Sequence, residues 1–363
     1  MTFEEARAAY PVLERFAYLN AGSVGPLARA TVDAIVEGRR RDLAEGRSGK
    51  AYFDEMRALR KRLRERLAAE IAVPVENVAL TRSTSDGCNL VLAGLGLGAE
   101  DEIVTTDVEH FGLLGALQAS GARVRVAAVR ERPAADALDV ILSEVTPRSR
   151  LLALSHVAWV TGHLLPVGEL RQATGLPVLV DGAQSAGAIP VEAAAFDWYT
   201  ISAQKWLCGP EPTGALHVAD PEALQVAYPS YFSYTEYDPD GSFAPRPGAA
   251  RFDSGWIDPP SLAGLEAALA VHPEWRFERA AAAAAECRAL LAERYEVVTE
   301  PRHATLVSFR WPRGEPAKAV ERAAERGVVI RGIPGTDLLR VSCGYWTSRD
   351  DLERLLAALD TLS

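Results

Sequence analysis

Short apolar runs alternate with longer amphipathic segments through most of this chain. Runs such as 78–81, 151–154 and 177–180 are four residues long and rich in Val, Leu and Ala. The segments between them place apolar residues three or four positions apart, which is the period of a helix with one buried face. Short buried strands that alternate with helices predict an α/β domain with a mainly parallel sheet.

The predicted elements of this large unit occupy the first two thirds of the chain. Its strands are predicted at 78–81, 102–105, 124–128, 151–154, 177–180, 198–201 and 215–218. Its helices are predicted at 26–45, 52–71, 110–119 and 135–145, after a short first helix at 3–9. Residues 228–250 are rich in Pro, Tyr, Gly and Ser, and we expect a long functional loop with little regular structure there.

The last third of the chain has a different pattern, typical of a small α+β domain. Helices are predicted at 261–271, 274–294, 317–326 and 349–361, and strands at 305–309, 328–331 and 338–342. We therefore expect two domains, a large one over residues 16–255 and a small one built from residues 1–15 and 256–363.

The composition narrows the class of protein. The net charge of −10 gives no support for nucleic-acid binding. No apolar run approaches the roughly 20 residues that span a bilayer, and the first residues lack the features of a signal peptide. The four cysteines lie far apart and the histidines have no metal-ligand spacing. We expect a cytoplasmic protein with no metal site and no membrane partner.

Two apolar runs near the middle of the chain end in polar clusters. The first runs into Asp181 and Gln184, and the second runs into Ser202 and Lys205. Side chains that follow parallel strands gather at the carboxyl-end edge of the sheet, where ligands bind in open α/β folds. Lys205 is one of only four lysines and is followed by apolar Trp206. We expect a desolvated amine with a lowered pKa, which Schiff-base chemistry requires.

The segment after the strand at 78–81 is a candidate anion site. Ser83, with Asp86 three residues later, has the pattern of a capping box at the start of a helix. Free N–H groups at such a start attract phosphate and carboxylate groups. An ordinary N-cap gives the same pattern and, taken alone, is the favoured interpretation. His110 follows the strand at 102–105, where a lone histidine is more often a capping or core residue.

Taken together, this sheet edge offers groups of six kinds, contributed by Ser83, Thr84, Ser85, His110, Asp181, Gln184, Ser202 and Lys205. Pyridoxal 5'-phosphate (PLP) uses an anion cradle, an aromatic ring, a carboxylate, an amide, a hydroxyl and an amine. Its aldehyde binds a lysine, and a carboxylate keeps its ring nitrogen protonated so that the ring stabilises a carbanion at the substrate α-carbon. The combination predicts a PLP enzyme.

The order and spacing of these motifs resemble the class V aminotransferase-like family of fold-type I PLP enzymes. This family includes cysteine desulfurases, cystine C–S lyases, kynureninases and isopenicillin epimerase-like proteins. The resemblance covers nearly the whole chain and is most specific at residues 180–184 and 202–207. It implies a large domain with a mainly parallel, seven-stranded sheet between helices, and a small C-terminal α+β domain.

The resemblance also implies roles for individual residues. Lys205 would form the Schiff base with the cofactor and later act as general base, Asp181 would pair with the pyridinium nitrogen, and His110 would stack on the ring. Gln184 would hydrogen-bond the phenolate oxygen. The phosphate would be held by the helix start and its neighbours, namely Ser83, Thr84, Ser85, Ser202 and Gln204. The substrate would be bound by Arg340, which matches the family's carboxylate-binding arginine, with Asn20 and Ser23 nearby.

The chain departs from the family pattern at several positions. Trp159 stands where the family has an asparagine near the cofactor oxygen. Trp256 stands where a threonine often reaches the phosphate of a neighbouring subunit. The span 331–337 before Arg340 is short and has no cysteine, whereas desulfurases carry their reactive cysteine there. Cys343 follows the arginine, and we expect it to be a buried, small apolar residue.

The resemblance therefore favours a PLP enzyme that abstracts the α-proton of an amino acid, with a C–S β-lyase acting on cysteine- or cystine-type substrates as the leading reaction. An aminotransferase or an epimerase needs the same cofactor residues and remains an alternative. A cysteine desulfurase is disfavoured by the cysteine-free span. A non-catalytic PLP-binding scaffold is a further alternative, and a nicotinamide enzyme is disfavoured because the first strand–helix turn lacks the glycine fingerprint. The resemblance also implies a homodimer.

Overall fold

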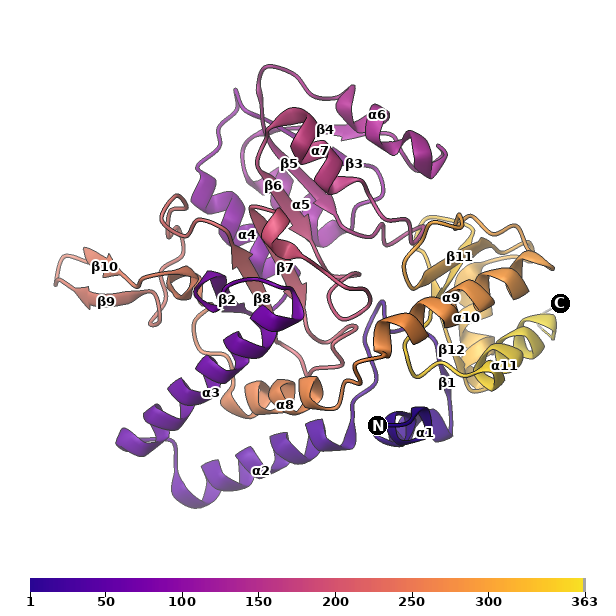
Figure 1. The fold of residues 1–363 in the computed structure, drawn as a ribbon, viewed down its shortest axis with the longest axis horizontal. Helices are drawn as coiled ribbons and strands as arrows, with labels where there is room; N and C mark the ends of the chain where they lie inside the picture. The colour runs from indigo at the N-terminus through magenta and orange to yellow at the C-terminus, as the bar shows by residue number, and fades with distance from the viewer. Residues whose placement is uncertain (362–363) are drawn as a thin grey trace.

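The computed structural model describes residues 1–361, which form a large unit and a small unit (Figure 1). The large unit is built on a seven-stranded sheet in the order β2-β8-β7-β6-β5-β3-β4. Only β8 runs antiparallel to its neighbours, and all other pairs are parallel. The strands are β2 Val78–Thr81, β3 Glu102–Thr106, β4 Arg123–Ala127, β5 Ser149–Ser155, β6 Val178–Asp181, β7 Trp198–Ser202 and β8 Gly214–Val218. The predicted fold class is confirmed.

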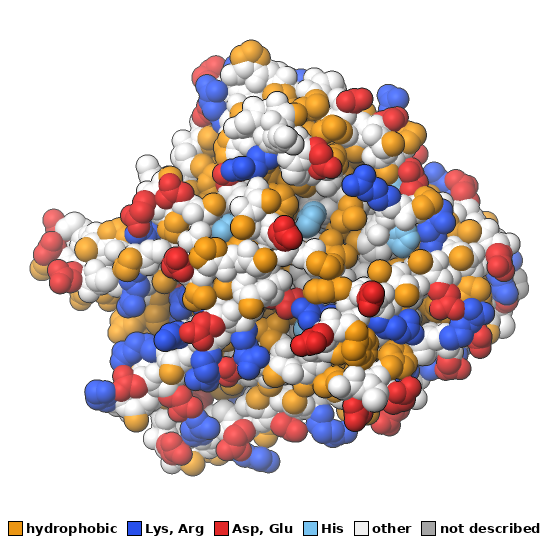
Figure 2. Space-filling view, in the orientation of Figure 1, with side chains coloured by type: hydrophobic (Ala, Val, Ile, Leu, Met, Phe, Trp, Pro, Cys, Tyr) orange, Lys and Arg blue, Asp and Glu red, His pale blue; other side chains and the backbone are white. Residues whose placement is uncertain are grey.

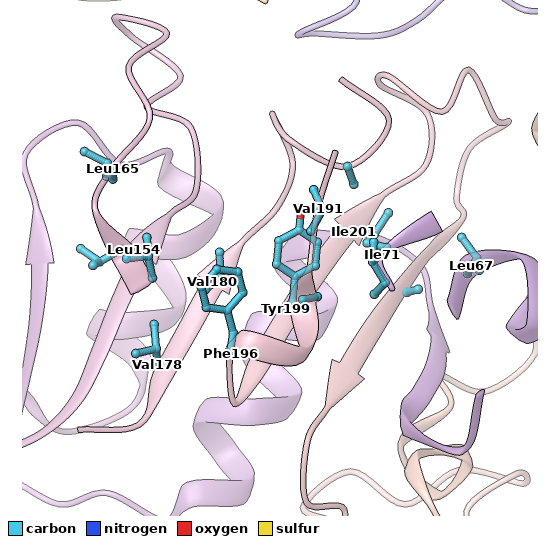
Figure 3. Close-up of a cluster of buried hydrophobic side chains, with 14 of the residues drawn as sticks. Leu67, Ile71, Leu154, Leu165, Val178, Val180, Val191, Phe196, Tyr199 and Ile201 are labelled. Atoms are coloured by element: carbon cyan, nitrogen blue, oxygen red, sulfur yellow. The ribbon is translucent and has the colours of Figure 1, made fainter. Parts of the chain in front are cut away.

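Helices cover both faces of this sheet, which explains why its strands are apolar throughout. Val178 and Val180 pack into one core, and Leu179 between them packs into the other core on the opposite face. Each such buried side chain contributes roughly 1.5–3 kcal/mol. Figure 3 shows the first core, where Val178 and Val180 lie beside Phe196 and Tyr199. The helices of this unit are α2 Arg29–Glu45, α3 Gly49–Glu70, α4 Thr84–Leu95, α5 Phe111–Ala119, α6 Ala137–Leu142, α7 Val167–Thr174 and α8 Pro259–Ala270.

The small unit combines the C-terminal third of the chain with the first residues. A three-stranded antiparallel sheet in the order β11-β14-β13 lies at its centre, and β1 pairs in parallel with β12. The N-terminal helix therefore lies near the C-terminal part of the chain in Figure 1. The elements are α1 Phe3–Ala8, β1 Ala17–Tyr18, α9 Arg276–Ala292, β11 Leu306–Arg310, α10 Pro316–Glu325, β12 Val328–Val329, β13 Arg331–Gly332, β14 Leu338–Ser342 and α11 Arg349–Asp360.

Helix α8 bears on the proposed domain boundary at residues 255–256. It follows that boundary in the sequence, yet it packs against α2 and α3. Its Leu262 and Leu265 belong to the core of the large sheet. The division of the chain into two domains stays a prediction, and α8 packs with the large sheet and not with the small unit to which the prediction assigned it.

Two predicted elements are wrong. Residues 228–250 were expected to be a long loop with little regular structure, but β9 Tyr234–Tyr237 and β10 Phe243–Pro245 form an antiparallel hairpin there that projects from the large unit (Figure 1). The single strand predicted at 328–331 is two short strands that pair with different partners, β12 with β1 and β13 with β14. Both errors concern pairings between segments that local sequence patterns do not encode. Within residues 1–361 no helix is long and apolar enough to cross a membrane.

Candidate active site

The carboxyl ends of β6 and β7 bring the two central residues of the site together. Asp181 is the last residue of β6, is buried, and accepts a hydrogen bond from the Ala183 N–H at 2.8 Å. Lys205 lies in the turn after β7. Burial lowers the pKa of Lys205 to about 8, helped by Arg340 and Arg331 and opposed by Asp181. The lowered pKa agrees with the expected desolvated amine, and the charges of Lys205 and Asp181 are close enough to interact.

A cradle for an anion forms where the start of α4 meets the end of β7. Ser83 is the N-cap of α4 and accepts from the Asp86 N–H. The Asp86 carboxylate accepts from the Arg82 N–H instead of the Ser83 N–H, so the predicted capping box is only half formed. The Thr84 N–H donates to Ser202 Oγ at 2.9 Å, and the two hydroxyls lie 2.8 Å apart.

A second helix start adjoins this cradle. A Cβ placed on Gly112, in the first turn of α5, would lie 2.4 Å from Ser85 Oγ, so the two helix starts are in close contact. N–H groups and dipoles from both helices are then available to one anion. The structure brings Ser83, Thr84, Ser85 and Ser202 together, as a phosphate site requires.

His110 is the N-cap of α5, as the capping interpretation expects, and it also borders the site. Its Nδ1 accepts from the Gly112 N–H at 3.0 Å, which places the proton of the neutral ring on Nε2. Burial lowers the pKa of His110, and the positive charge of Lys205 lowers it further. Its ring meets Trp159 edge to face, with centroids 5.1 Å apart and planes at 85°. A neutral, oriented ring of this kind suits contact with a flat ligand.

Arg340 enters the site from the small unit. It lies in the middle of β14, is 1% exposed, and donates from Nη1 to the Trp159 carbonyl at 2.9 Å. Burial lowers its pKa to about 9, and the charge of Arg331 adds to this. Among the described residues, no carboxylate forms an ion pair with it. A buried guanidinium without an anionic partner is suited to receive one from a ligand.

The loop that follows β1 closes the site between the two units. The Gly22 carbonyl accepts from Gln184 Nε2 at 2.8 Å, and the Gly22 N–H donates to Ser342 Oγ at 3.2 Å. A Cβ on Gly22 would lie 2.8 Å from Arg340 Nη2, so a larger residue here would displace the Arg340 guanidinium. Asn20 and Ser23 lie in this loop and bond to each other, Ser23 Oγ donating to Asn20 Oδ1 at 2.8 Å.

The structure brings most of the predicted site residues together. Two of them, Gln184 and Trp256, make contacts that were not predicted. Gln184 bonds within the protein, since its Oε1 also accepts from Trp206 Nε1 at 3.0 Å, which leaves one amide hydrogen for a ligand. Trp256 does not join the cluster. It is 53% exposed and packs against Phe53, Tyr231 and Phe232 on the large unit.

The chemistry of the site fits PLP. Within the predicted site residues, three buried polar atoms have no hydrogen-bond partner in the part of the chain that the structure describes, namely Gln204 Oε1, Trp159 Nε1 and Arg340 Nε. An unpaired buried donor or acceptor costs about 1–3 kcal/mol, so partners from a polar ligand would stabilise the protein. Figure 2 shows a recess near the centre of the molecular face, between the two units, with hydrophobic and histidine side chains around it.

The structure also adds a residue that the sequence interpretation missed. The charge of Arg331 lowers the pKa of Lys205, His110 and Arg340, so its guanidinium lies near all three. A signal was present in the sequence, because Arg331 follows an apolar run and is the first residue of the cysteine-free span. Its pairing with Arg340 across β13 and β14 depends on the sheet and could not be read from that run.

Comparisons with known proteins agree with this geometry. The sequence model of the family described as "Aminotransferase class-V" matches residues 17–355. The chain is 29% identical to isopenicillin N epimerase of Streptomyces clavuligerus over 99% of this chain and 98% of that protein. It is 32% identical to a cysteine desulfurase of Klebsiella pneumoniae subsp. pneumoniae over 74% and 72% of the two chains.

Solved structures of PLP enzymes are also similar to this chain. A C-DES mutant with glycine covalently linked to its PLP cofactor superposes with a TM-score of 0.90 at 29% identity, covering 97% of this chain and 98% of that one. The cystine C–S lyase C-DES in complex with its reaction product cysteine persulfide superposes with a TM-score of 0.89 at 29% identity, covering 96% and 98%.

Proposed function

Because this chain belongs to the class-V aminotransferase family, whose characterised relatives are PLP-dependent enzymes, we propose that it is a PLP-dependent β-lyase that cleaves the C–S bond of a cysteine- or cystine-type amino acid. With cystine, one water is consumed, and pyruvate, ammonia and cysteine persulfide are released. No electron acceptor is needed. Likeness to the lyase C-DES over nearly the whole of both chains supports this choice.

In this proposal the cofactor is held by the residues assembled above. Thr84, Ser85 and Ser202 bind the phosphate, with the helix starts of α4 and α5 and the nearby Gln204 in support. Asp181 pairs with the ring nitrogen, and His110 covers the ring. When bound, PLP supplies an electron sink for the negative charge that develops at the substrate α-carbon.

The protein's own groups carry out binding and proton transfer. Arg340 binds the substrate carboxylate, because its buried guanidinium has no carboxylate partner among residues 1–361 and its Nε has no hydrogen-bond partner there. The Lys205 amine, whose pKa is lowered to about 8, can exist as the free base near neutral pH and takes the α-proton. Loss of this proton is followed by departure of the sulfur substituent with its bonding electrons.

The observation that carries the choice of lyase over desulfurase is the absence of an accessible thiol. All four cysteines of the chain are free and buried. Cys343 lies in the core of the small unit beside Cys287, and Cys208 packs with Tyr10 and Tyr345. A desulfurase of the family pattern requires a reachable cysteine before the carboxylate arginine, and residues 331–337 have none.

Epimerisation is the second candidate, favoured by the 29% identity to isopenicillin N epimerase over nearly the full length of both chains. An epimerase uses the same α-proton abstraction and returns a proton to the opposite face. The two reactions therefore differ in product and not in the residues that hold the cofactor.

Product analysis of the purified holoenzyme separates these reactions. The enzyme is incubated in D2O with cystine, S-methylcysteine, or alanine plus a keto acid. Keto-acid and ammonia release without an acceptor supports the lyase. Deuterium entry at the α-carbon with inversion and no keto acid supports an epimerase, and acceptor-dependent keto-acid formation supports an aminotransferase. Lys205→Ala is the negative control and is expected to abolish all three.

A further inference from the structure

The paired register between β3 and β5 ends before the edge where the site lies. The parallel pairing of β3 with β5 ends at Val104 and Leu152. Beyond these residues the two strands continue toward the site, β3 to Thr106 and β5 to Ser155. The β3 end and the turn to His110 that follows it therefore lie beyond the paired register that joins β3 to β5.

Glu109 connects the two strands beyond this register. Its side chain is buried and lies directly before His110. One carboxylate oxygen accepts from Thr106 Oγ1 at 2.6 Å, within the same turn. The other accepts from the Ser155 N–H at 2.9 Å and also from Ser155 Oγ. Three donors converge on a single buried carboxylate, and they connect the ends of β3 and β5.

The Ser155 end of this bridge leads directly to Asp181. Ser155 is the register partner of Asp181 across β5 and β6, and the next N–H, of His156, donates to the Asp181 carbonyl at 3.0 Å. Glu109 therefore connects the turn that presents His110 to the strand pair that presents Asp181. These two residues flank the place proposed for the cofactor ring.

The surroundings of Glu109 destabilise its charged form. The hydrogen bonds from Thr106 and Ser155 offset part of this free-energy cost. Burial raises the pKa of Glu109 to about 7, and the nearby Asp181 charge contributes, while the bonds from Ser155 and Thr106 oppose the shift. The other titratable group facing it is the buried thiol of Cys88 on α4. Burying a second carboxylate close to Asp181 costs free energy. We therefore expect the Glu109 carboxylate to have a role in the site.

We propose that Glu109 is a positioning residue of the active site, whose carboxylate bridges Thr106 and Ser155 and thereby fixes the His110 ring opposite Asp181 for contact with the cofactor ring. The inference rests on the proposed cofactor placement and does not depend on which reaction follows. It goes beyond that placement because Glu109 touches neither cofactor nor substrate.

The test measures the environment of the cofactor in the holoenzyme and its affinity for the apoprotein. Glu109→Gln keeps the size of the side chain but replaces one acceptor oxygen with a donor. It is expected to lower the visible circular dichroism per bound PLP and to weaken PLP binding about tenfold, the loss of one hydrogen bond to a charged group. Ser155→Ala removes one donor, and smaller changes in the same direction are expected.

Glu102→Gln is the matched control. Glu102 is the first residue of the same strand, is equally buried, and accepts from Thr146 Oγ1 at 2.6 Å at the opposite end of the sheet. This variant is expected to lose thermal stability while its PLP affinity and visible dichroism stay at the level of the unmodified protein. If Glu109→Gln behaves in the same way, the inference fails.

A double-mutant cycle with His110→Ala identifies the residue through which Glu109 acts. His110→Ala alone must change the visible dichroism, and if it does not, the proposed placement of the cofactor ring is wrong and the inference falls with it. In the His110→Ala background, Glu109→Gln is expected to add no further change. A full additional change would show that Glu109 acts through another group and would overturn the inference while leaving the placement intact.

Discussion

Arg331 and Arg340 are direct partners across the antiparallel strands β13 and β14, and neither guanidinium forms an ion pair with a carboxylate in residues 1–361. Two like charges side by side repel each other, and Arg331 contributes to lowering the pKa of Arg340. Such a pair of guanidinium groups can bind anionic groups of a ligand. We infer that Arg340 binds the substrate α-carboxylate and that Arg331 stabilises a second anionic group when the substrate has one.

Substitution of each arginine is expected to distinguish these roles. Arg340→Gln leaves the substrate carboxylate without its buried partner and should lower kcat/KM about 100-fold for every substrate, roughly 3 kcal/mol. Arg331→Gln should lower kcat/KM more for cystine, with its second carboxylate, than for S-methylcysteine. Arg310→Gln, an exposed position with acidic partners, is the control and should change neither. Equal losses for both substrates in Arg331→Gln would contradict the second-anion role.

The lowered pKa of Lys205 gives a prediction for the reaction of the apoprotein with PLP. Only the unprotonated amine attacks an aldehyde, and burial lowers the Lys205 pKa to about 8. The rate constant should therefore fall about tenfold for each pH unit below 8 and level off above it. Stopped-flow absorbance between pH 6 and 9 measures this. A free lysine derivative, with its ordinary pKa, should show no plateau in that range, and Asp181→Asn should move the plateau to lower pH.

Gly25 is in close contact with the backbone of Lys205. Its N–H donates to the Gln204 carbonyl at 2.7 Å, and a Cβ at Gly25 would lie 2.1 Å from the Lys205 carbonyl oxygen. Gly25→Ala must displace one of the two segments, so we expect weaker PLP binding and a stability loss of about 1–3 kcal/mol. Gly98→Ala has open space around its Cβ and serves as the control. Unchanged PLP affinity in Gly25→Ala would show that this contact is dispensable.

Asp253 anchors strand β2, which leads into the anion cradle. This buried carboxylate accepts from Arg60, Arg64 and the Leu80 N–H of strand β2. Asp253→Asn leaves buried guanidinium charge uncompensated and is expected to cost about 3–5 kcal/mol in urea unfolding. Glu55→Gln, which removes an exposed ion pair with Arg41, should cost no more than about 1 kcal/mol. Similar midpoints for the two variants would be evidence against a structural role of Asp253.

The aromatic group around Trp256 bears on the proposed homodimer. Trp256 and Tyr231 are more than half exposed, and their rings stack with centroids 5.7 Å apart. Exposed aromatic patches of this kind mark interaction surfaces. Trp256→Asp is expected to shift the protein toward monomer in sedimentation equilibrium, whereas Val126→Asp, on the distant edge strand β4, should leave the mass unchanged. A fully active wild-type monomer would exclude the dimer as a requirement for activity.

The local sequence was sufficient for the elements that carry Asp181 and Lys205. Continuous apolar runs identify strands buried on both faces, and the polar residue that ends each run must lie at the carboxyl edge of a parallel sheet. Ser83 and His110 were likewise predictable, since a residue between a strand and a helix is placed at the helix start. These inferences need only the period of the pattern and the direction of the chain.

Tertiary structure alone decided which segments meet. The bridge from Glu109 to Ser155, the pairing of Arg331 with Arg340 and the contact of Gly22 with Gln184 each join residues from different parts of the chain. The hairpin in 234–245 and the antiparallel β8 depend in the same way on pairing between strands. Periodicity reports the faces and ends of an element, but its neighbours are chosen by the packing of the whole chain.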